Sequence, residues 1–522
     1  MRLLRFGSAR HAEAPAGAAA RGSRRRSSSW TGLVLLLGIG AGGGAAADSD
    51  AVAPGDTLRV PLRDCVERAL SAGEEMRIAA ADYDLAHAAY LSTRSTALPQ
   101  LTFSSSYTRQ VKSVFEAGDT GAGIEPFEPD PSAPDSARIR ALENALPDAG
   151  LTALTDLFKS TPLASENTWV MYVGVTQKLL EGGSIHASIQ AARHAMTAAD
   201  RLRADRGDEM VLETRQAYLG ALLADRAVRI AELGVEQADS QLRRVRLRQE
   251  AGQASEFDLL QAEVQRDNQV PIVKRARNRR EIAYLELRRL ANLPLGVPMV
   301  LTTPLLDDAA VPRDPAAVDT TDLVPLALRA SGVTALEEVL RARDRAVTVA
   351  AKDRWPGLSL FADFSRQAFP RSVLPKAGEW RDDVKAGVRL NWNLFDGLRT
   401  RGAVRQSLAE RLIAEQNLRR AREAVREAVV QSREELERAA LDLEARARTA
   451  RVAKRALELA NLRYEEGASS LIEIADVRIA YQVAETNAAQ ARHDYFVALA
   501  RLERYTGRPL FTNVAQPVEG WR

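Results

Sequence analysis

The sequence predicts an α+β membrane protein in which each chain supplies four amphipathic strands and several long coiled-coil helices. Three observations lead to this fold class. Short segments alternate apolar and polar residues, long proline-free stretches carry a heptad repeat, and the N-terminus has the composition of an export signal. The same order of signals occurs twice along the chain, which indicates a duplication.

The composition favours long helices over a series of ordinary globular domains. Of the 522 residues, 46% are hydrophobic and 27% are charged, but only 5% are aromatic. Abundant alanine, leucine, arginine and glutamate suit helical coils. The net charge is +3, and basic residues alternate with acids along the helices, so we expect no nucleic-acid partner. A single cysteine, Cys65, excludes an intramolecular disulfide and a cysteine-rich metal site.

Residues 1–47 are predicted to be a signal peptide. Arginines at 24–26 precede an apolar run at 30–39, and alanines at 45–47 provide a small-residue cleavage site before Asp48. The apolar run is too short to span a bilayer as a helix, and no later stretch is apolar enough to do so. An exported chain of this kind is either soluble or crosses a membrane with strands.

The rest of the chain is predicted to contain two structural repeats. Each has a helical segment, a proline, two extended runs, a glycine, and a long helical stretch broken at a second glycine. Gly182 and Gly397 are 215 residues apart (397 − 182), and Gly252 and Gly467 are also 215 apart (467 − 252). The predicted division is a first repeat at 48–300 with its tip at Gly252, a linker at 301–320, a second repeat at 321–507 with its tip at Gly467, and a C-terminal tail at 508–522.

The extended runs are predicted strands with one apolar and one polar face. In residues 384–394, Val384 and Val388 fall on one face, while Lys385 and Arg389 fall on the other. The runs around 101–108, 169–177 and 358–365 alternate in the same way. A soluble β-sandwich and a membrane barrel both show this pattern, so the pattern alone leaves both open.

The number of strands bears on that choice. Four strands cannot close a barrel, and lipid permits no open sheet edge. A membrane protein with four strands per chain therefore needs several chains, and three would supply twelve strands. The export signal and the long helices favour the membrane over the sandwich. Residues between the paired strands, at 112–166 and 367–383, would then be extracellular; the first of these loops contains ten acidic and four basic residues.

Residues 184–250 are predicted to be one long helix. They contain no proline, and at about 1.5 Å per residue they would extend for ~100 Å. Small or apolar residues recur with alternating spacings of four and three: Ala217, Ala221, Ala224, Val228, Ala231, Val235, Ala238, Leu242 and Val245. Alanine allows close approach of helices but buries little apolar area. The pattern favours a thin-walled tube of many helices over a two-stranded coiled coil.

The repeated order of helix, proline-led strand, glycine-ended strand, long helix and glycine break resembles the TolC family of outer-membrane ducts. The resemblance covers about 60–507. It implies a homotrimer with a twelve-stranded barrel in the outer membrane, continued by a coiled-coil helical barrel in the periplasm. The implied function is the exit duct of a tripartite efflux or type I secretion system. The implied partners are outer-membrane lipid, a periplasmic membrane-fusion adaptor and an inner-membrane pump (RND, ABC or similar).

The resemblance also implies two adaptor-docking tips, where the long helices reverse direction. The residues that match the family pattern are Arg248, Gly252 and Ser255 in the first tip, and Arg463, Gly467 and Ser470 in the second. Glycine has a physical reason there, because a helix reversal requires positive φ. The arginine and serine side chains have an alternative role, which is to cap the helix ends.

The family's entrance constriction corresponds to Tyr464, Glu473 and Asp476 of the second repeat and to Asp258 of the first. By resemblance, Asp258 acts across the chain interface to hold the entrance closed. Glu473 and Asp476 are three residues apart, so both can project from one helix face. Three copies would place six carboxylates around one opening, which would attract cations. Solvated surface acids are the alternative interpretation.

Two other functions were weighed. For an enzyme, the five histidines form no HExxH or other ligand pattern, and no nucleophile motif is present, so we expect no catalysis, no metal site and no cofactor. A periplasmic coiled-coil adaptor or a structural scaffold protein is the second alternative. Adaptors carry one helical hairpin, whereas this chain has two complete repeats with paired strands.

Overall fold

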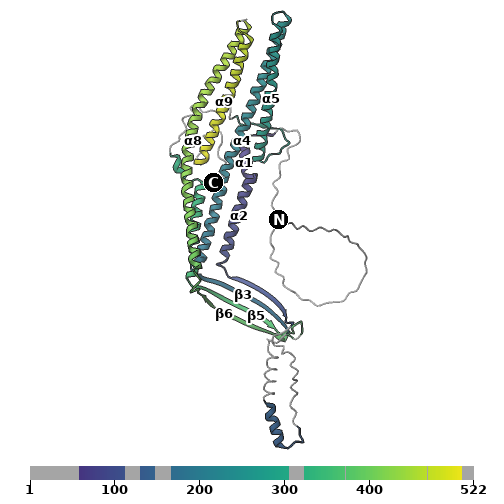
Figure 1. Cartoon of the computed structure of the whole chain (residues 1–522), viewed down its shortest axis with the longest axis vertical. Coiled ribbons are helices and arrows are strands. Elements are labelled where there is room, and N and C mark those ends of the chain that lie inside the picture. The colour runs from purple at the N-terminus through teal and green to yellow at the C-terminus, as the bar shows by residue number, and fades with distance from the viewer. Residues whose placement is uncertain are drawn as a thin grey trace, which may run out of the picture. The chain divides into compact units, whose positions relative to one another are not determined.

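The computed structural model describes residues 58–111, 130–146, 166–304, 322–370, 372–466 and 468–507 (Figure 1). The predicted signal peptide and C-terminal tail therefore lie outside the described residues, as do Gly467, residues 305–320 of the predicted linker and most of the acidic loop. The division of the chain into two repeats and a linker stays a prediction at its boundaries.

Four strands form one antiparallel sheet in the order β2-β3-β5-β6. They are β2 (Gln100–Arg109), β3 (Asn167–Glu181), β5 (Gly357–Ala368) and β6 (Trp380–Asn391). Within the described residues, β2 pairs only with β3, and β6 pairs only with β5. Both edges of the sheet are therefore open in one chain. The last predicted strand was placed too late, because it begins at Trp380 and ends before Trp392.

The strand register keeps the predicted apolar and polar faces apart. Val175 lies opposite Ala362, which lies opposite Ala386, whereas Asp363 lies opposite Lys385 on the other face. Several large side chains of the apolar face are exposed in the single chain: Leu101, Phe103, Met171, Leu360, Phe364, Val384, Val388 and Leu390. A sheet with one uncovered apolar face and one polar face suits lipid on the first and water on the second.

The two longest helices, α4 (Ser184–Glu250) and α8 (Arg399–Glu465), each contain 67 residues. Each is followed by a return helix, α5 (Glu256–Leu290) or α9 (Leu471–Thr506). Both pairs are related by the same offset of 215 residues (399 − 184 and 471 − 256) as the glycines. α4 packs on α5, α8 packs on α9, and α4 also packs on α9 (Figure 1).

The shorter helices cover the half of the long helices that adjoins the sheet. The helical segment predicted at 62–96 is two helices, α1 (Leu62–Ala72) and α2 (Glu74–Ser95), because Gly73 has an extended backbone with ψ 137°. Its counterpart is α6 (Leu323–Ala327) followed by α7 (Ser331–Ala350). α2 and α7 both pack on α4, and α7 also packs on α8. No helix among the described residues has both the length and the apolar character to cross a membrane.

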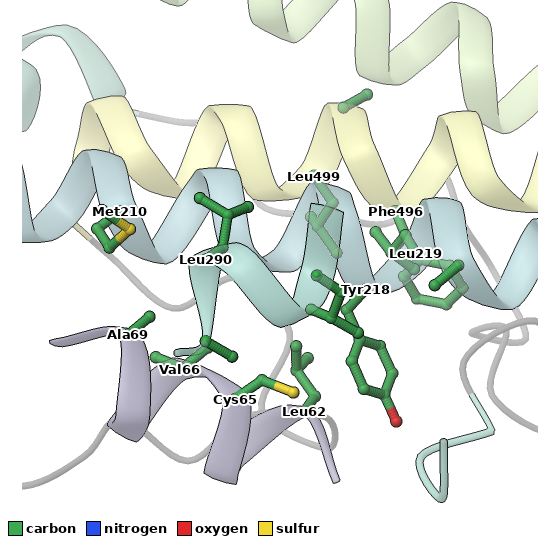
Figure 2. Packing of buried hydrophobic residues seen from close by; sticks show 14 of the residues in the cluster. Leu62, Cys65, Val66, Ala69, Met210, Tyr218, Leu219, Leu290, Phe496 and Leu499 are labelled. Carbon is green, nitrogen blue, oxygen red and sulfur yellow. The ribbon is translucent and has the colours of Figure 1, made fainter. Parts of the chain in front are cut away.

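The main core lies where α1, α4, α5 and α9 meet (Figure 2). The fully buried Tyr218 of α4 also orders two short strands, β1 (Leu58–Val60) and β4 (Met299–Leu301), which pair in parallel. Its hydroxyl donates to the Val60 carbonyl at 3.1 Å and accepts from the Thr303 N–H at 3.0 Å. The start of the described chain and the end of the first repeat are thereby fixed to the middle of α4.

Candidate functional site

The first helix reversal needs a glycine for its backbone, not for space. α4 ends at Glu250, and Gly252 has a φ of +72°. A Cβ at Gly252 would meet nothing within 4 Å. The N–H of Gln253 donates to the Arg248 carbonyl at 2.7 Å and so satisfies one of the last carbonyls of α4. Residues with a side chain avoid positive φ, so Gly252 sets the place where the chain turns.

Ser255 caps the return helix α5. Its hydroxyl oxygen accepts from the Asp258 N–H at 3.2 Å, and the Asp258 carboxylate accepts from the Ser255 N–H at 3.0 Å. The Ser255 hydroxyl also donates to that carboxylate at 2.7 Å. These bonds form a capping box and lower the pKa of Asp258, since they favour its ionised form. Within one chain, both side chains therefore serve the helix start.

The second reversal repeats this arrangement. Gly467 lies outside the described residues, but the N–H of Ala468 donates to the Arg463 carbonyl at 2.8 Å, as Gln253 does to Arg248. Ser470 caps α9, and its hydroxyl oxygen accepts from the Glu473 N–H at 3.2 Å. The alternative that the sequence left open, a capping role for the serines, is therefore what both serines do in the single chain.

The two predicted entrance acids have different surroundings. The Glu473 carboxylate accepts from the Ser469 hydroxyl at 2.8 Å and from an Arg463 guanidinium nitrogen at 3.2 Å. Arg463 offsets part of its charge, although the pair is exposed enough for water and salt to weaken that effect. Asp476 is exposed. Asp476 is therefore the acid whose charge is more available to a passing ion.

A contact between the two reversals was not predicted from the sequence. The Arg248 guanidinium lies over the Tyr464 ring, 4.6 Å from its centroid. Tyr464 also packs against a small apolar cluster that contains Val245 and Ala262. The structure thus brings together one predicted tip residue and one predicted entrance residue, and it ties the first helical hairpin to the second. Asp258, by contrast, is bonded to Ser255 and not to Tyr464.

Within the ranges that the structure describes, no three histidine, cysteine, aspartate or glutamate side chains gather as metal ligands would. The ends of the hairpins offer different chemistry: two charged arginines, two capped helix starts, and two carboxylates three residues apart on α9. Such an arrangement can bind another protein or bias the passage of ions, but it holds no activated nucleophile.

Comparison with known proteins adds to this geometry. The model of a family described as outer membrane efflux protein matches residues 65–293 and 327–508. The outer membrane protein TolC of Vibrio cholerae is 23% identical over 365 residues, which are 69% of this chain and 82% of that protein.

Solved structures with a similar fold include three membrane proteins. One is the CmeC outer membrane channel of Campylobacter jejuni, with a TM-score of 0.67, 16% identity and 85% of each chain covered. Another is the open state of the MtrE outer membrane channel of Neisseria gonorrhoeae, with a TM-score of 0.65, 17% identity, and 87% of this chain and 91% of that chain covered. The third is a membrane protein from Pseudomonas aeruginosa, with a TM-score of 0.65, 20% identity, and 85% and 92% covered.

Proposed function

Because this chain belongs to the outer membrane efflux protein family, we propose that three copies of it form one exit duct through which substrates leave the cell. Membership makes the chain an outer-membrane channel protein, with its sheet in the membrane and its helices in the periplasm. The family match favours this function over the periplasmic adaptor or scaffold that the sequence left as an alternative. The observation that carries the proposal is the four-stranded sheet with two open edges.

The open edges argue for assembly through the strands. The backbone N–H and C=O groups on the outer sides of β2 and β6 have no strand beside them in one chain, and such groups are costly in hydrocarbon. Pairing β2 of one copy with β6 of the next removes every edge, and three copies give twelve strands. Asp363 and Lys385 would then face the water-filled interior. Trp355, Trp392 and Phe395, exposed near the helical end of the sheet, suit the lipid headgroup level.

The helices also present surface for other copies. Large apolar side chains are exposed along α5 and α8: Phe257, Leu260, Val264, Ile272, Ile282 and Leu285 on α5, and Leu408, Leu412, Ile413, Val430, Leu441, Val452, Leu459 and Leu462 on α8. Burying them against neighbouring helices would stabilise a closed tube, since apolar burial contributes about 25 cal/mol per Å².

The mass of the detergent-extracted protein tests the assembly. We expect a complex of three chains that runs as an oligomer without heating and as a monomer after boiling. A stable monomer or dimer in a range of mild detergents would overturn the proposal.

We propose that the two helix reversals dock a periplasmic membrane-fusion adaptor, which connects the duct to an inner-membrane pump of the RND, ABC or a similar class. The reversals support this because Arg248 and Arg463 lie beside turns that no other helix covers in the single chain. Substituting Gly252→Pro or Gly467→Pro should leave trimers in the membrane but abolish adaptor crosslinking and export. Gly378→Ala, in the loop beyond β5, is the control. Loss of trimers in parallel with export would limit the two glycines to a role in assembly.

We further propose that Tyr464, Asp258, Glu473 and Asp476 form the periplasmic entrance. Because Arg463 offsets part of the Glu473 charge, Asp476→Ala should reduce cation selectivity in single-channel recordings more than Glu473→Ala does. The double variant should also lose block by multivalent cations. Unchanged selectivity and unchanged block in the double variant would show that these acids do not line the opening.

The family is one of transport channels, and we propose that this chain catalyses no reaction and uses no cofactor. Transport would depend on the energy of the pump. A chemical turnover by the purified trimer without pump or adaptor would contradict this.

A further inference from the structure

A buried polar cluster lies between α4 and α9, away from the two reversals. Gln241 of α4 is 1% exposed, and Arg478 of α9 is 7% exposed. α4 and α9 pack directly against each other and belong to different hairpins. Arg478 follows the fully buried Ile474 by one helical turn, so a charged side chain occupies a position at which the packing pattern calls for an apolar one.

The cluster has more hydrogen-bond donors than acceptors. The Gln241 side-chain oxygen accepts from both Nε and Nη2 of Arg244, at 3.3 and 2.7 Å. That leaves the buried Nε2 of Gln241 and the buried Nε of Arg478 without an acceptor among the described residues. Buried donors are nearly always bonded in folded proteins, to protein, water or ligand. Two unbonded donors beside each other therefore indicate a missing acceptor.

The cluster also lacks a negative charge. Burial lowers the pKa of Arg478, and the positive charge of Arg244 lowers it further. A buried arginine is normally paired with an acid, but the acids nearest in sequence on the two helices pair with other arginines: Asp239 with Arg266, Glu473 with Arg463, and Glu485 with Arg226. Two guanidinium groups thus face each other with no carboxylate between them.

We propose that Arg244 and Arg478 bind a small inorganic oxyanion, such as phosphate or sulfate, with the side-chain amide of Gln241 as a third donor. A planar guanidinium donates two parallel hydrogen bonds to an oxyanion, which a single halide ion does not match. The proposal does not depend on the export function. A carboxylate from another copy is a less suitable source, because the chain itself encloses more than nine-tenths of Arg478. The bound ion would join the first hairpin to the second.

Binding of radioactive sulfate to the full-length, detergent-extracted protein tests the proposal directly. The protein is first dialysed free of phosphate and sulfate, and sodium chloride holds the ionic strength constant. We expect one saturable sulfate site per chain, an affinity at least tenfold weaker in Arg244→Met, and no binding in Arg478→Met. Arg243→Met is the matched control, because Arg243 is exposed and bonds only to Ser240. No saturable binding to the wild type, or equal binding in both variants and the control, would overturn the proposal.

Thermal unfolding provides a second measurement that does not require the Arg478 variant to bind anything. Sulfate at millimolar concentration should raise the unfolding temperature of the wild type but not of Arg478→Met or Arg244→Met, because only a bound ion stabilises by mass action. General salting effects of sulfate act on all variants alike. In the absence of sulfate, Arg478→Met should unfold at a higher temperature than the wild type, since it removes an unpaired buried charge. Equal sulfate shifts in all variants would exclude the site.

Discussion

Substituting Tyr218→Phe should loosen the small β1–β4 sheet and leave the helices intact. The ring is fully buried, and phenylalanine retains it, so only the hydroxyl is lost. The Val60 carbonyl keeps a second bond from the Thr302 N–H at 3.2 Å. The Thr303 N–H, however, loses its acceptor. Leaving one partly buried amide unbonded costs about 1–2 kcal/mol, which corresponds to a local opening constant roughly 5- to 30-fold larger.

Hydrogen exchange measures this opening without requiring reversible unfolding of a membrane protein. The peptide that contains residues 299–304 should exchange roughly 5 to 30 times faster in Tyr218→Phe than in the wild type. Tyr284→Phe is the matched control, because it removes a hydroxyl from the same core that bonds to Asp225 at 2.6 Å and to neither strand. An unchanged rate in Tyr218→Phe, or an equal increase in the control, would refute the role assigned to the hydroxyl.

Three further predictions concern the helix reversals. Gly252→Ala should cost about 1–2 kcal/mol through its positive φ and speed hydrogen exchange at 251–256, whereas Gly252→Asn should cost less; equal effects would exclude backbone strain. The pKa of Asp258 lies below its ordinary value of 3.8, so its capping contribution should be present above pH 3.8 and lost as pH falls through the lower folded pKa; exchange of the first turn of α5, corrected for intrinsic rates, should show this loss in the wild type but not in Asp258→Asn. Arg248→Met should remove about 0.5–1 kcal/mol of contact with Tyr464 and raise the open probability of the channel roughly 2- to 5-fold, whereas Arg246→Met should not.

The fold class and the family could be predicted because their signals are local and repeated. Alternation with period two marks the four strands, and a heptad pattern without proline marks α4. The 215-residue offset then supports each half with the other. The β1–β4 pair could not be predicted, because each strand is only three residues long and its partner lies 241 residues away in sequence (299 − 58). Segments this short have no measurable period.

The candidate site was predictable only where a residue acts on its own backbone. Gly252 and Ser255 follow from the chemistry of turns and caps, which depends on neighbours a few residues away. The contact of Arg248 with Tyr464 and the burial of Arg478 depend on how α4 meets the second hairpin. A heptad pattern states which face of a helix is buried but not which partner buries it. For that reason a buried arginine reads in sequence as one more solvated charge.

The distribution of buried residues along the long helices has a consequence for how the duct would open. Near Tyr218, α4 contributes to a core that contains leucine, tyrosine, phenylalanine and methionine from several helices. Toward the reversals, the remaining clusters consist of two or three buried residues, mostly alanine. Alanine buries much less apolar area than leucine or tyrosine, so the helix ends are held mainly by ion pairs and by the Arg248–Tyr464 contact. Regions with few apolar contacts open at lower free energy than the core. The hairpin ends can therefore separate while the core around Tyr218 stays packed, and a partner that binds the reversals need supply only the energy of those few polar contacts.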